Sequence, residues 1–489
     1  MLFNSYIFIL AFLPLSLAGY YALNRIRPLY GEIFLIAMSL WFYGYFNPWY
    51  LLLISASIAV NYSLTVFMRG RSSAVRRLLL AAGCAFNVGL LFYFKYYNFF
   101  LSNVSRFFNI GFHEKNILLP LGISFFTFQQ LSYLIDCYHG DISYNPVEYA
   151  LFVTFFPQLV AGPIVLHTEL VPQFRDPARK RPDAEYMMRG IRMFTQGLAK
   201  KLLLADVFGT VVAWCFANLD KTGPDEWILT SLAYTFQIYF DFSGYSDMAS
   251  GLASMFHLEL PMNFNSPYRA LSFTDFWRRW HMTLTRFLRT YLYFPLGGSR
   301  RGKARTYLNT MIVFLVSGIW HGANWTFILW GVLHGALCCL DRAASSLWDR
   351  VLKPVRWLVT FILVDLLWIL FRADSVRQWL DILNAIRQFR FIQLVEMNQS
   401  FVDSFFPPEM KWFFRELGLV DAGGHVQGPG ARLWILFLFA LSFGIVLFGK
   451  NIFRRKYRPK AAEAVTTAVL LFACILSLGK VSIFLYFNF

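Results

Sequence analysis

Long apolar segments, separated by short polar connections, recur along almost the whole chain. A helix needs about 20 mainly apolar residues to cross a bilayer. The spacing therefore predicts an all-α polytopic membrane protein, in which residues 1–489 form a single transmembrane domain. We expect about 10–12 membrane segments, some of them re-entrant or interfacial. The candidate segments are 5–24, 30–46, 48–68, 78–100, 117–137, 148–166, 188–218, 227–255, 307–322, 324–341, 355–372, 433–449 and 463–487.

Three basic runs give the predicted orientation, because cytoplasmic loops carry an excess of Lys and Arg. These runs lie at residues 25–27, 69–77 and 450–460. Placing all three in the cytoplasm puts both termini outside. It also puts the longest polar interval, 373–432, on the extracytoplasmic side. The mixed charges of that interval suit either a docking surface for an external partner or a loop with a short interfacial helix.

The composition fits a membrane protein, since 57% of the residues are hydrophobic and only 15% are charged. The net charge of +17 would suggest nucleic acid binding in a soluble protein. Here the positive charge falls between the apolar segments, so we expect no nucleic acid to bind. The six cysteines lie mostly in apolar runs without metal-ligand spacing. We therefore expect no metal site and no disulfide framework. The sequence also has no Gly-rich nucleotide loop, so we expect no bound cofactor.

The segment from Trp277 to Tyr291 has two faces at ~100° per residue, which is typical of an interfacial amphipathic helix. One arc holds Trp277, Trp280, Leu284, Phe287, Leu288 and Tyr291. The opposite side holds Arg278, Arg279, Arg286 and Arg289. These arginines either anchor lipid headgroups or form a basic rim for the phosphates of a cytoplasmic acyl donor such as a coenzyme A thioester. His281 lies at the edge of the apolar arc, next to the arginines.

A histidine interrupts the next apolar run, residues 307–340. As one helix this run would be ~50 Å long, against a hydrocarbon core of ~30 Å. A break is therefore expected, with Gly318 and Gly322 as its expected places. His321 then lies at or near a discontinuity at membrane depth. Ionisable side chains in a membrane are costly and usually functional, which makes His321 a candidate catalytic residue.

Three other polar side chains lie near His321 in the sequence. Ser317 is four residues before it and Asn324 three residues after it, so either can orient the imidazole if the local structure is helical. His334 would be ~20 Å away on a continuous helix, so we expect a structural role for it.

A polar stripe of Tyr234, Gln237, Asp241 and Tyr245 follows helical spacing further upstream. It either lines a funnel, where its first three residues would bind the substrate or donor, or packs one helix against another. Lys95 is expected to extend its side chain to the membrane interface.

Several motifs stand in a fixed order along the chain. They are LFNSYIFILAFLPL near the start, FKYYNFF, LPLGISFFTFQQLSYLID, FFPQLVAGPI, YFDFSGYSDMA, DFWRRWHMTLTRFLRTYLYFPLGG, SGIWHGANWTFILWGVLHG, WILFRA and the FLYFNF ending. Together they resemble the membrane-bound O-acyltransferase (MBOAT) family, and within it the bacterial alginate O-acetyltransferase (AlgI-like) branch. The resemblance covers most of the chain apart from parts of 373–432, and its core is the stretch 271–335.

This resemblance implies a helical fold with a central funnel and a histidine at its bottom. The family's invariant histidine falls on His321. Its second motif position, Asn in many eukaryotic members and His in the bacterial branch, falls on His281. His321 would then be the general base, while His281 polarises the thioester carbonyl or orients the acceptor. The resemblance also implies acetyl-CoA as donor substrate, a polysaccharide acceptor, extracytoplasmic partner proteins, surrounding membrane lipids and a bacterial inner membrane.

The predicted function is thus a membrane O-acyltransferase, with acetyl as the expected group. It would move that group from a cytoplasmic donor to hydroxyls of an extracytoplasmic polysaccharide such as alginate. A D-alanyl or peptidoglycan O-acyltransferase is the alternative within the same family. Outside the family, the alternatives are a lipid or glycan transporter with the polar stripe as its path, and a non-catalytic scaffold of a polysaccharide-secretion complex.

Overall fold

The computed structural model describes residues 1–140, 142–389, 397–421, 423–426, 428–454, 461–479 and 484–485. Within these ranges the regular structure is helical, apart from one isolated β-bridge between Val420 and Val426. Six described helical segments are long and apolar enough to cross a membrane: Phe8–Ile26, Trp49–Met68, Ser73–Phe108, Trp325–Ala343, Lys353–Arg372 and Pro429–Phe448. The predicted all-α polytopic class is confirmed, while the count of 10–12 segments stays a prediction.

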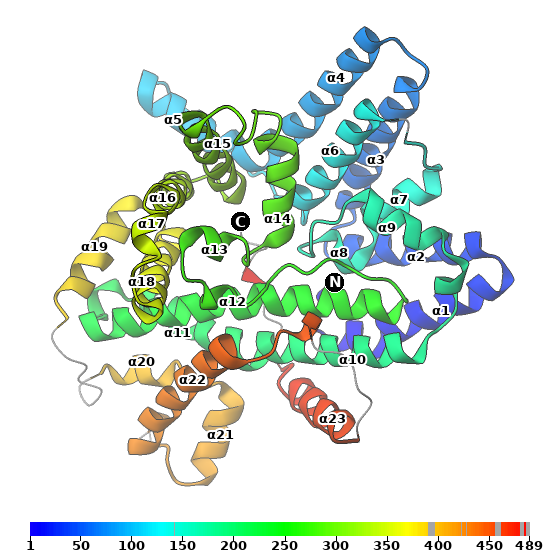
Figure 1. Cartoon of the computed structure of the whole chain (residues 1–489). Coiled ribbons are helices and arrows are strands. Elements are labelled where there is room, and N and C mark those ends of the chain that lie inside the picture. The colour runs from blue at the N-terminus through cyan, green and yellow to red at the C-terminus, as the bar shows by residue number, and fades with distance from the viewer. Residues whose placement is uncertain are drawn as a thin grey trace.

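The first helices gather at one side of the molecule, on the right of Figure 1, with α5 set apart from them. Their bounds are α1 (Leu13–Ile26), α2 (Pro28–Gly44), α3 (Trp49–Met68), α4 (Ser73–Leu91), α5 (Tyr97–Phe108), α6 (Ile123–His139), α7 (Pro146–Thr154), α8 (Phe156–Leu159) and α9 (His167–Arg175). The predicted span 148–166 is wrong, because α7 ends at Thr154 and the backbone turns at Phe155. Pro157 follows at once, and its missing N–H could not continue the helix.

One long helix, α12 (Pro224–Met255), runs through the centre of the molecule, and α10 (Ala184–Ala199) lies along it (Figure 1). The two helices approach very closely, since a Cβ on Gly197 would lie 2.5 Å from the carbonyl oxygen of Gly244. Small residues permit such backbone contact between helices. A π-helical turn, η4 (Lys200–Ala205), joins α10 to α11 (Asp206–Ala217). Several of the later helices pack against this group of helices.

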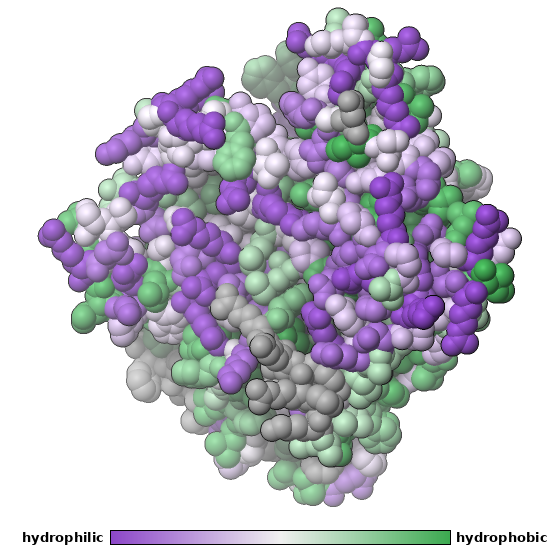
Figure 2. Space-filling model, turned by 45° about the vertical axis from the view of Figure 1, so that its right-hand side comes forward, coloured by the Kyte–Doolittle hydropathy of each residue, from purple (hydrophilic) through white to green (hydrophobic). Residues whose placement is uncertain are grey.

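The later helices complete the molecule around α12 (Figure 1). They are α13 (Phe273–Trp277), α14 (Met282–Leu288), α15 (Lys303–His321), α16 (Trp325–Ala343), α17 (Ser345–Trp348), α18 (Lys353–Arg372), α19 (Val376–Arg387), α20 (Gln399–Asp403), α21 (Pro408–Glu416), α22 (Pro429–Phe448) and α23 (Ala461–Leu476). Figure 2 shows hydrophilic residues over much of one face and hydrophobic residues along its lower edge. Most of the basic run 450–460 and the end of the last predicted span lie outside the described residues.

The described parts of the polar interval 373–432 are folded against the helices. In α19, Trp379 donates its indole N–H to the carbonyl oxygen of Leu366 at 3.1 Å. After α20, His425 shares a hydrogen bond with Asp403, and this carboxylate raises the pKa of the imidazole. The short helices agree with the loop-and-helix alternative, and the external docking role stays a prediction.

Candidate active site

His321 is the last residue of α15, at the turn of a helical hairpin. Gly322 is extended, with φ −168°, and Asn324 caps the N-terminus of α16. The predicted break is therefore confirmed at Gly322, but Gly318 is helical. A Cβ on Gly318 would lie 2.4 Å from the carbonyl oxygen of Phe327, so this glycine lets α15 and α16 pack closely.

Aromatic rings enclose His321, which is only 3% exposed. Its ring centroid lies 4.9 Å from that of Trp320 and 5.2 Å from those of Trp330 and Phe371. The rings come from α15, α16 and α18, three helices that meet at the turn. They fix the plane of the imidazole and exclude bulk water from it.

Lys95 and Tyr96 hold the end of α15 in place. Lys95 donates from Nζ to the carbonyl oxygen of Trp320 at 2.6 Å, and Tyr96 donates its hydroxyl to that of Ile319 at 2.8 Å. A cation at a helix C-terminus satisfies its unpaired carbonyls and complements the helix dipole. The expectation that Lys95 extends to the membrane interface is wrong. Lys95 lies in a π-helical turn, η2 (Phe92–Tyr96). Such turns are frequent at functional sites, so this local feature identifies Lys95 as a residue of the site.

His281 lies in a break between α13 and α14, so the predicted continuous helix from Trp277 to Tyr291 is wrong. Its backbone is left-handed, with φ 44°. The helix stops because the next backbone N–H, of Met282, donates to the carbonyl oxygen of Asn263 at 2.9 Å. Strained backbone of this kind is concentrated at functional sites. The apolar arc is buried inside the protein rather than facing lipid; Trp280, for example, is 2% exposed.

Asn263 also fixes the imidazole of His281. Its Oδ1 is 3.0 Å from His281 Nδ1, and it accepts a hydrogen bond from the hydroxyl of Thr283 at 2.9 Å. A side-chain carbonyl oxygen only accepts hydrogen bonds, so His281 Nδ1 must carry a proton. In the neutral ring, Nε2 then carries the lone pair. Sequence reasoning missed Asn263, because eighteen residues separate it from His281 and no motif spacing links them.

The fold brings the three histidines of this region together. His281 lies 6.2 Å from Trp320 between ring centroids, and Trp320 also contacts His321. His334 is 4.7 Å from Trp330, whose ring contacts His321 as well. The ~20 Å separation of a continuous helix does not hold for His334, because the turn folds α16 back along α15.

The predicted orienting residues have other contacts. Asn324 accepts the backbone N–H of Thr326 at 3.1 Å and donates to the carbonyl oxygen of Asp374 at 3.0 Å. Ser317 is buried one turn before His321 on α15. Asn324 thus shapes the turn, and an orienting role for Ser317 stays a prediction.

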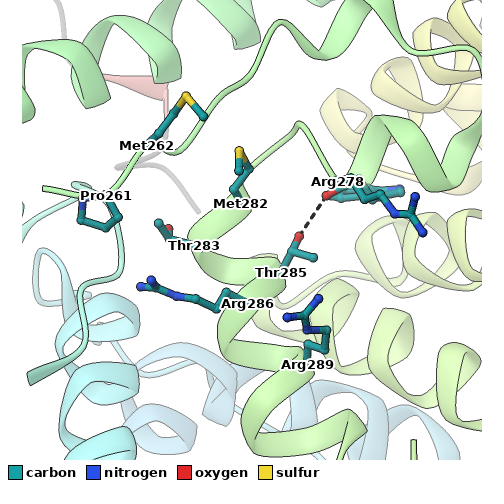
Figure 3. Close-up of a pocket in the computed structure, with 9 residues that line it drawn as sticks. Pro261, Met262, Arg278, Met282, Thr283, Thr285, Arg286 and Arg289 are labelled. Carbon is teal, nitrogen blue, oxygen red and sulfur yellow. Dashed lines mark hydrogen bonds between the residues drawn. The ribbon is translucent and has the colours of Figure 1, made fainter. Parts of the chain in front are cut away.

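A cavity of about 390 Å³ opens beside α14, and three of the four predicted arginines line it: Arg278, Arg286 and Arg289. Figure 3 shows Arg286 on α14, Arg289 directly after the end of that helix, and Arg278 directly after the end of α13. We call it the arginine cavity. Arg286 is paired with Glu169, at 2.8 Å for one of its two contacts. Arg279 does not line the cavity and is bound to Asp275 at 2.8 Å.

Two cavity arginines keep their charge uncompensated among the described residues. Arg278 and Arg289 are exposed, and neither forms an ion pair there. Arg289 lies over the ring of Phe294, at 5.6 Å from the centroid. The cavity therefore offers two guanidinium groups to an anionic ligand. This is what the predicted role of the arginines as a basic rim for the phosphates of an acyl donor requires.

The polar stripe packs α12 against its neighbours. Asp241 forms a buried ion pair with Lys201 of η4 at 2.7 Å. A Cβ on Gly209 of α11 would lie 2.9 Å from Gln237 Nε2, which places that side chain between two helices. Tyr234 is fully buried. Asp241 thus fits the helix-packing interpretation, and none of the three lines the arginine cavity. Their binding of substrate or donor stays a prediction.

The arrangement offers imidazoles as proton carriers and guanidinium groups as an anion site. Within the described ranges, no group of three or more His, Cys, Asp or Glu side chains is arranged to hold a metal ion. Proton transfer and charge stabilisation by these side chains are the chemistry that the geometry provides.

Comparisons with known proteins agree with this chemistry. The model of the membrane-bound O-acyltransferase family, MBOAT, matches residues 139–351. Peptidoglycan O-acetyltransferase of Helicobacter pylori is 40% identical over 433 residues, which are 82% of this chain and 82% of that protein. The probable alginate O-acetylase AlgI of Pseudomonas aeruginosa is 40% identical over 82% of this chain and 77% of its own length. Teichoic acid D-alanyltransferase of Lacticaseibacillus rhamnosus is 28% identical over 47% and 61%.

Proposed function

We propose that this chain, which belongs to the membrane-bound O-acyltransferase family and is an acyltransferase of the membrane, moves acetyl from cytoplasmic acetyl-CoA to hydroxyls of an extracytoplasmic polysaccharide such as alginate. The observation that carries the proposal is the contact of His321 and His281 with the same indole ring, Trp320. Two relatives that are 40% identical over most of the chain have names that specify O-acetyl transfer, which supports acetyl over D-alanyl.

His321 is the general base in this proposal. It takes the proton from the acceptor hydroxyl as the hydroxyl oxygen attacks the carbonyl carbon of the thioester. The carbon–sulfur bond then breaks, and the proton passes to the leaving thiolate. His281 presents a lone pair at Nε2, because Asn263 holds the proton at Nδ1. A lone pair accepts a hydrogen bond from a hydroxyl, whereas polarising a carbonyl oxygen needs an N–H donor. His281 therefore fits the role of orienting the acceptor better than that of polarising the carbonyl.

The arginine cavity supports a phosphate-bearing donor. We expect Arg289→Gln to raise the KM for acetyl-CoA about tenfold, since one charge-assisted hydrogen bond contributes roughly 1.5–3 kcal/mol and this site is partly solvated. The kcat should be unchanged, because the contact is made equally before and during the reaction. The measurement uses inverted membrane vesicles, which present the cytoplasmic face to added radiolabelled acetyl-CoA. Arg279→Gln is the matched control, because Arg279 is paired with Asp275 outside the cavity. Equal KM shifts in both variants would argue against this donor site.

The acceptor is tested by removing the gene and restoring it. The proposal places the chain in the bacterial inner membrane, surrounded by lipid, with extracytoplasmic partner proteins completing the transfer to polysaccharide. We expect the deletion strain to lose alkali-labile acetate from its exopolysaccharide while polymer yield is unchanged, and the restored gene to return it. Loss of acetate from peptidoglycan instead would identify the alternative acceptor. Unchanged acetylation of both polymers would contradict the proposed function.

A further inference from the structure

In the proposed reaction, neither His281 nor His321 donates a hydrogen bond to the carbonyl oxygen of the thioester. When a hydroxyl adds to a thioester carbonyl, negative charge develops on the carbonyl oxygen, and this charge needs hydrogen-bond donors. His281 offers a lone pair at Nε2 because its proton is held at Nδ1. His321 must accept a proton in the same step. The donors must therefore come from other groups near His321.

His334 has the opposite proton position. The indole N–H of Trp277 donates to His334 Nδ1 at 3.3 Å. An indole nitrogen only donates, so Nδ1 carries the lone pair and the neutral ring has its proton on Nε2. His334 is 0% exposed, and its Nε2 has no hydrogen-bond partner among the described residues. Trp277 also lines the arginine cavity, which places His334 one ring away from the proposed donor site.

Trp330 supplies a second donor of the same kind. Its ring contacts His321 at 5.2 Å and His334 at 4.7 Å between centroids. The residue is 0% exposed, and its Nε1–H also has no acceptor in the described part of the chain. Buried donors nearly always have partners, and one without an acceptor is costly. Trp320 Nε1–H is in the same state, but Trp330 and His334 are the two donors whose rings contact each other, next to the candidate base. This pair can donate to one oxygen atom that carries lone pairs.

We propose that Trp330 Nε1–H and His334 Nε2–H bind the carbonyl oxygen of the acyl group beside His321 and stabilise the charge that it gains in the transition state. This inference rests on the proposed function and assigns a subsite to the same reaction. The hydroxyl oxygen bonds to the carbonyl carbon while its proton moves to His321. The carbonyl π electrons move to the oxygen held by the two donors. They return as the carbon–sulfur bond breaks, and the thiolate takes the proton from His321.

The test removes each N–H while keeping a ring. In the inverted vesicles with radiolabelled acetyl-CoA, we expect His334→Phe and Trp330→Phe each to lower kcat by about 10²-fold, as loss of one such donor does elsewhere, with KM for acetyl-CoA unchanged. His334→Gln keeps an N–H near the position of Nε2 and should recover part of the lost kcat. Trp412→Phe, on an indole that is 64% exposed, is the matched control. Melting temperatures of the solubilised variants show whether they are folded.

The outcomes separate the possibilities. An unchanged kcat in both folded Phe variants would overturn the inference, and the two N–H groups would then serve only water. An equal loss in His334→Phe and His334→Gln, with both folded, would also overturn it, because the N–H would not be the group that matters. A rise in KM without a fall in kcat would show ordinary substrate binding, against the inference. A wild-type protein that transfers no acetyl would instead overturn the proposed function, and this inference with it.

Discussion

His321→Ala is expected to lower the acetyl-transfer rate by about 10²–10⁴-fold, the range that a positioned general base contributes. The imidazole is buried against Trp320, Trp330 and Phe371 at the end of α15, where bulk water cannot replace it as a proton acceptor. The rate is measured in inverted vesicles with radiolabelled acetyl-CoA. O-acetyl content of the extracellular polymer, at matched membrane levels of protein, gives the same comparison in cells.

Two further variants make this result specific to the chemistry. His321→Gln keeps much of the side-chain volume but cannot accept and release a proton, so it should be as inactive as His321→Ala. His113→Ala removes a histidine from an exposed loop and should leave transfer unchanged. Normal acetylation in the His321→Gln strain would rule out the general-base role and return attention to the transporter and scaffold alternatives.

Lys201→Met is expected to destabilise the protein by about 3–5 kcal/mol, the usual effect of removing one partner from a buried ion pair. The side chains of Lys201 and Asp241 are each 3% exposed, and their nitrogen and oxygen are 2.7 Å apart. Lys201 also pairs with Asp206 at 2.8 Å. Without the ammonium group, the Asp241 carboxylate has lost its buried counter-charge between η4 and α12. Thermal unfolding of the detergent-solubilised protein measures the effect.

The control for this prediction is an ion pair that is exposed to solvent. Arg189 and Glu259 are 36% and 46% exposed, so Arg189→Met should change stability by ~1 kcal/mol or less. Adding Asp241→Leu to Lys201→Met should restore part of the lost stability, because the unpaired charge is removed. A normal melting temperature together with a raised KM for acetyl-CoA in Asp241→Asn would favour the donor-binding role of Asp241 instead.

Much of the fold follows from local pattern. Apolar runs of sufficient length predict helices because a backbone in lipid must satisfy its own hydrogen bonds. The run 307–340 is too long for one span, which predicted a break at Gly318 or Gly322 without any tertiary information. The break lies at Gly322. The span 148–166 failed for an equally local reason, because Pro157 inside the apolar run cannot continue a helix.

The candidate site was only partly predictable. His321 is conspicuous because a lone ionisable group in an apolar run is costly, and His281 because a motif contains it. The break at His281 was not predictable from helical spacing. It depends on hydrogen bonds to Asn263. The backbone N–H of Met282 donates to the carbonyl oxygen of Asn263 instead of to a carbonyl oxygen of the preceding helical turn, and the Asn263 side chain binds the imidazole of His281.

The sequence by itself determined the helical class, the family, the break after His321 and the two histidines of the motifs. The tertiary structure alone decided which groups surround them. Lys95 reaches the end of α15 across 225 residues of sequence, and Trp277 reaches His334 across 57. Spacing along a chain specifies which side chains share one helix face. Proton positions on the histidines are set by partners from other helices, and these partners meet only when the helices pack.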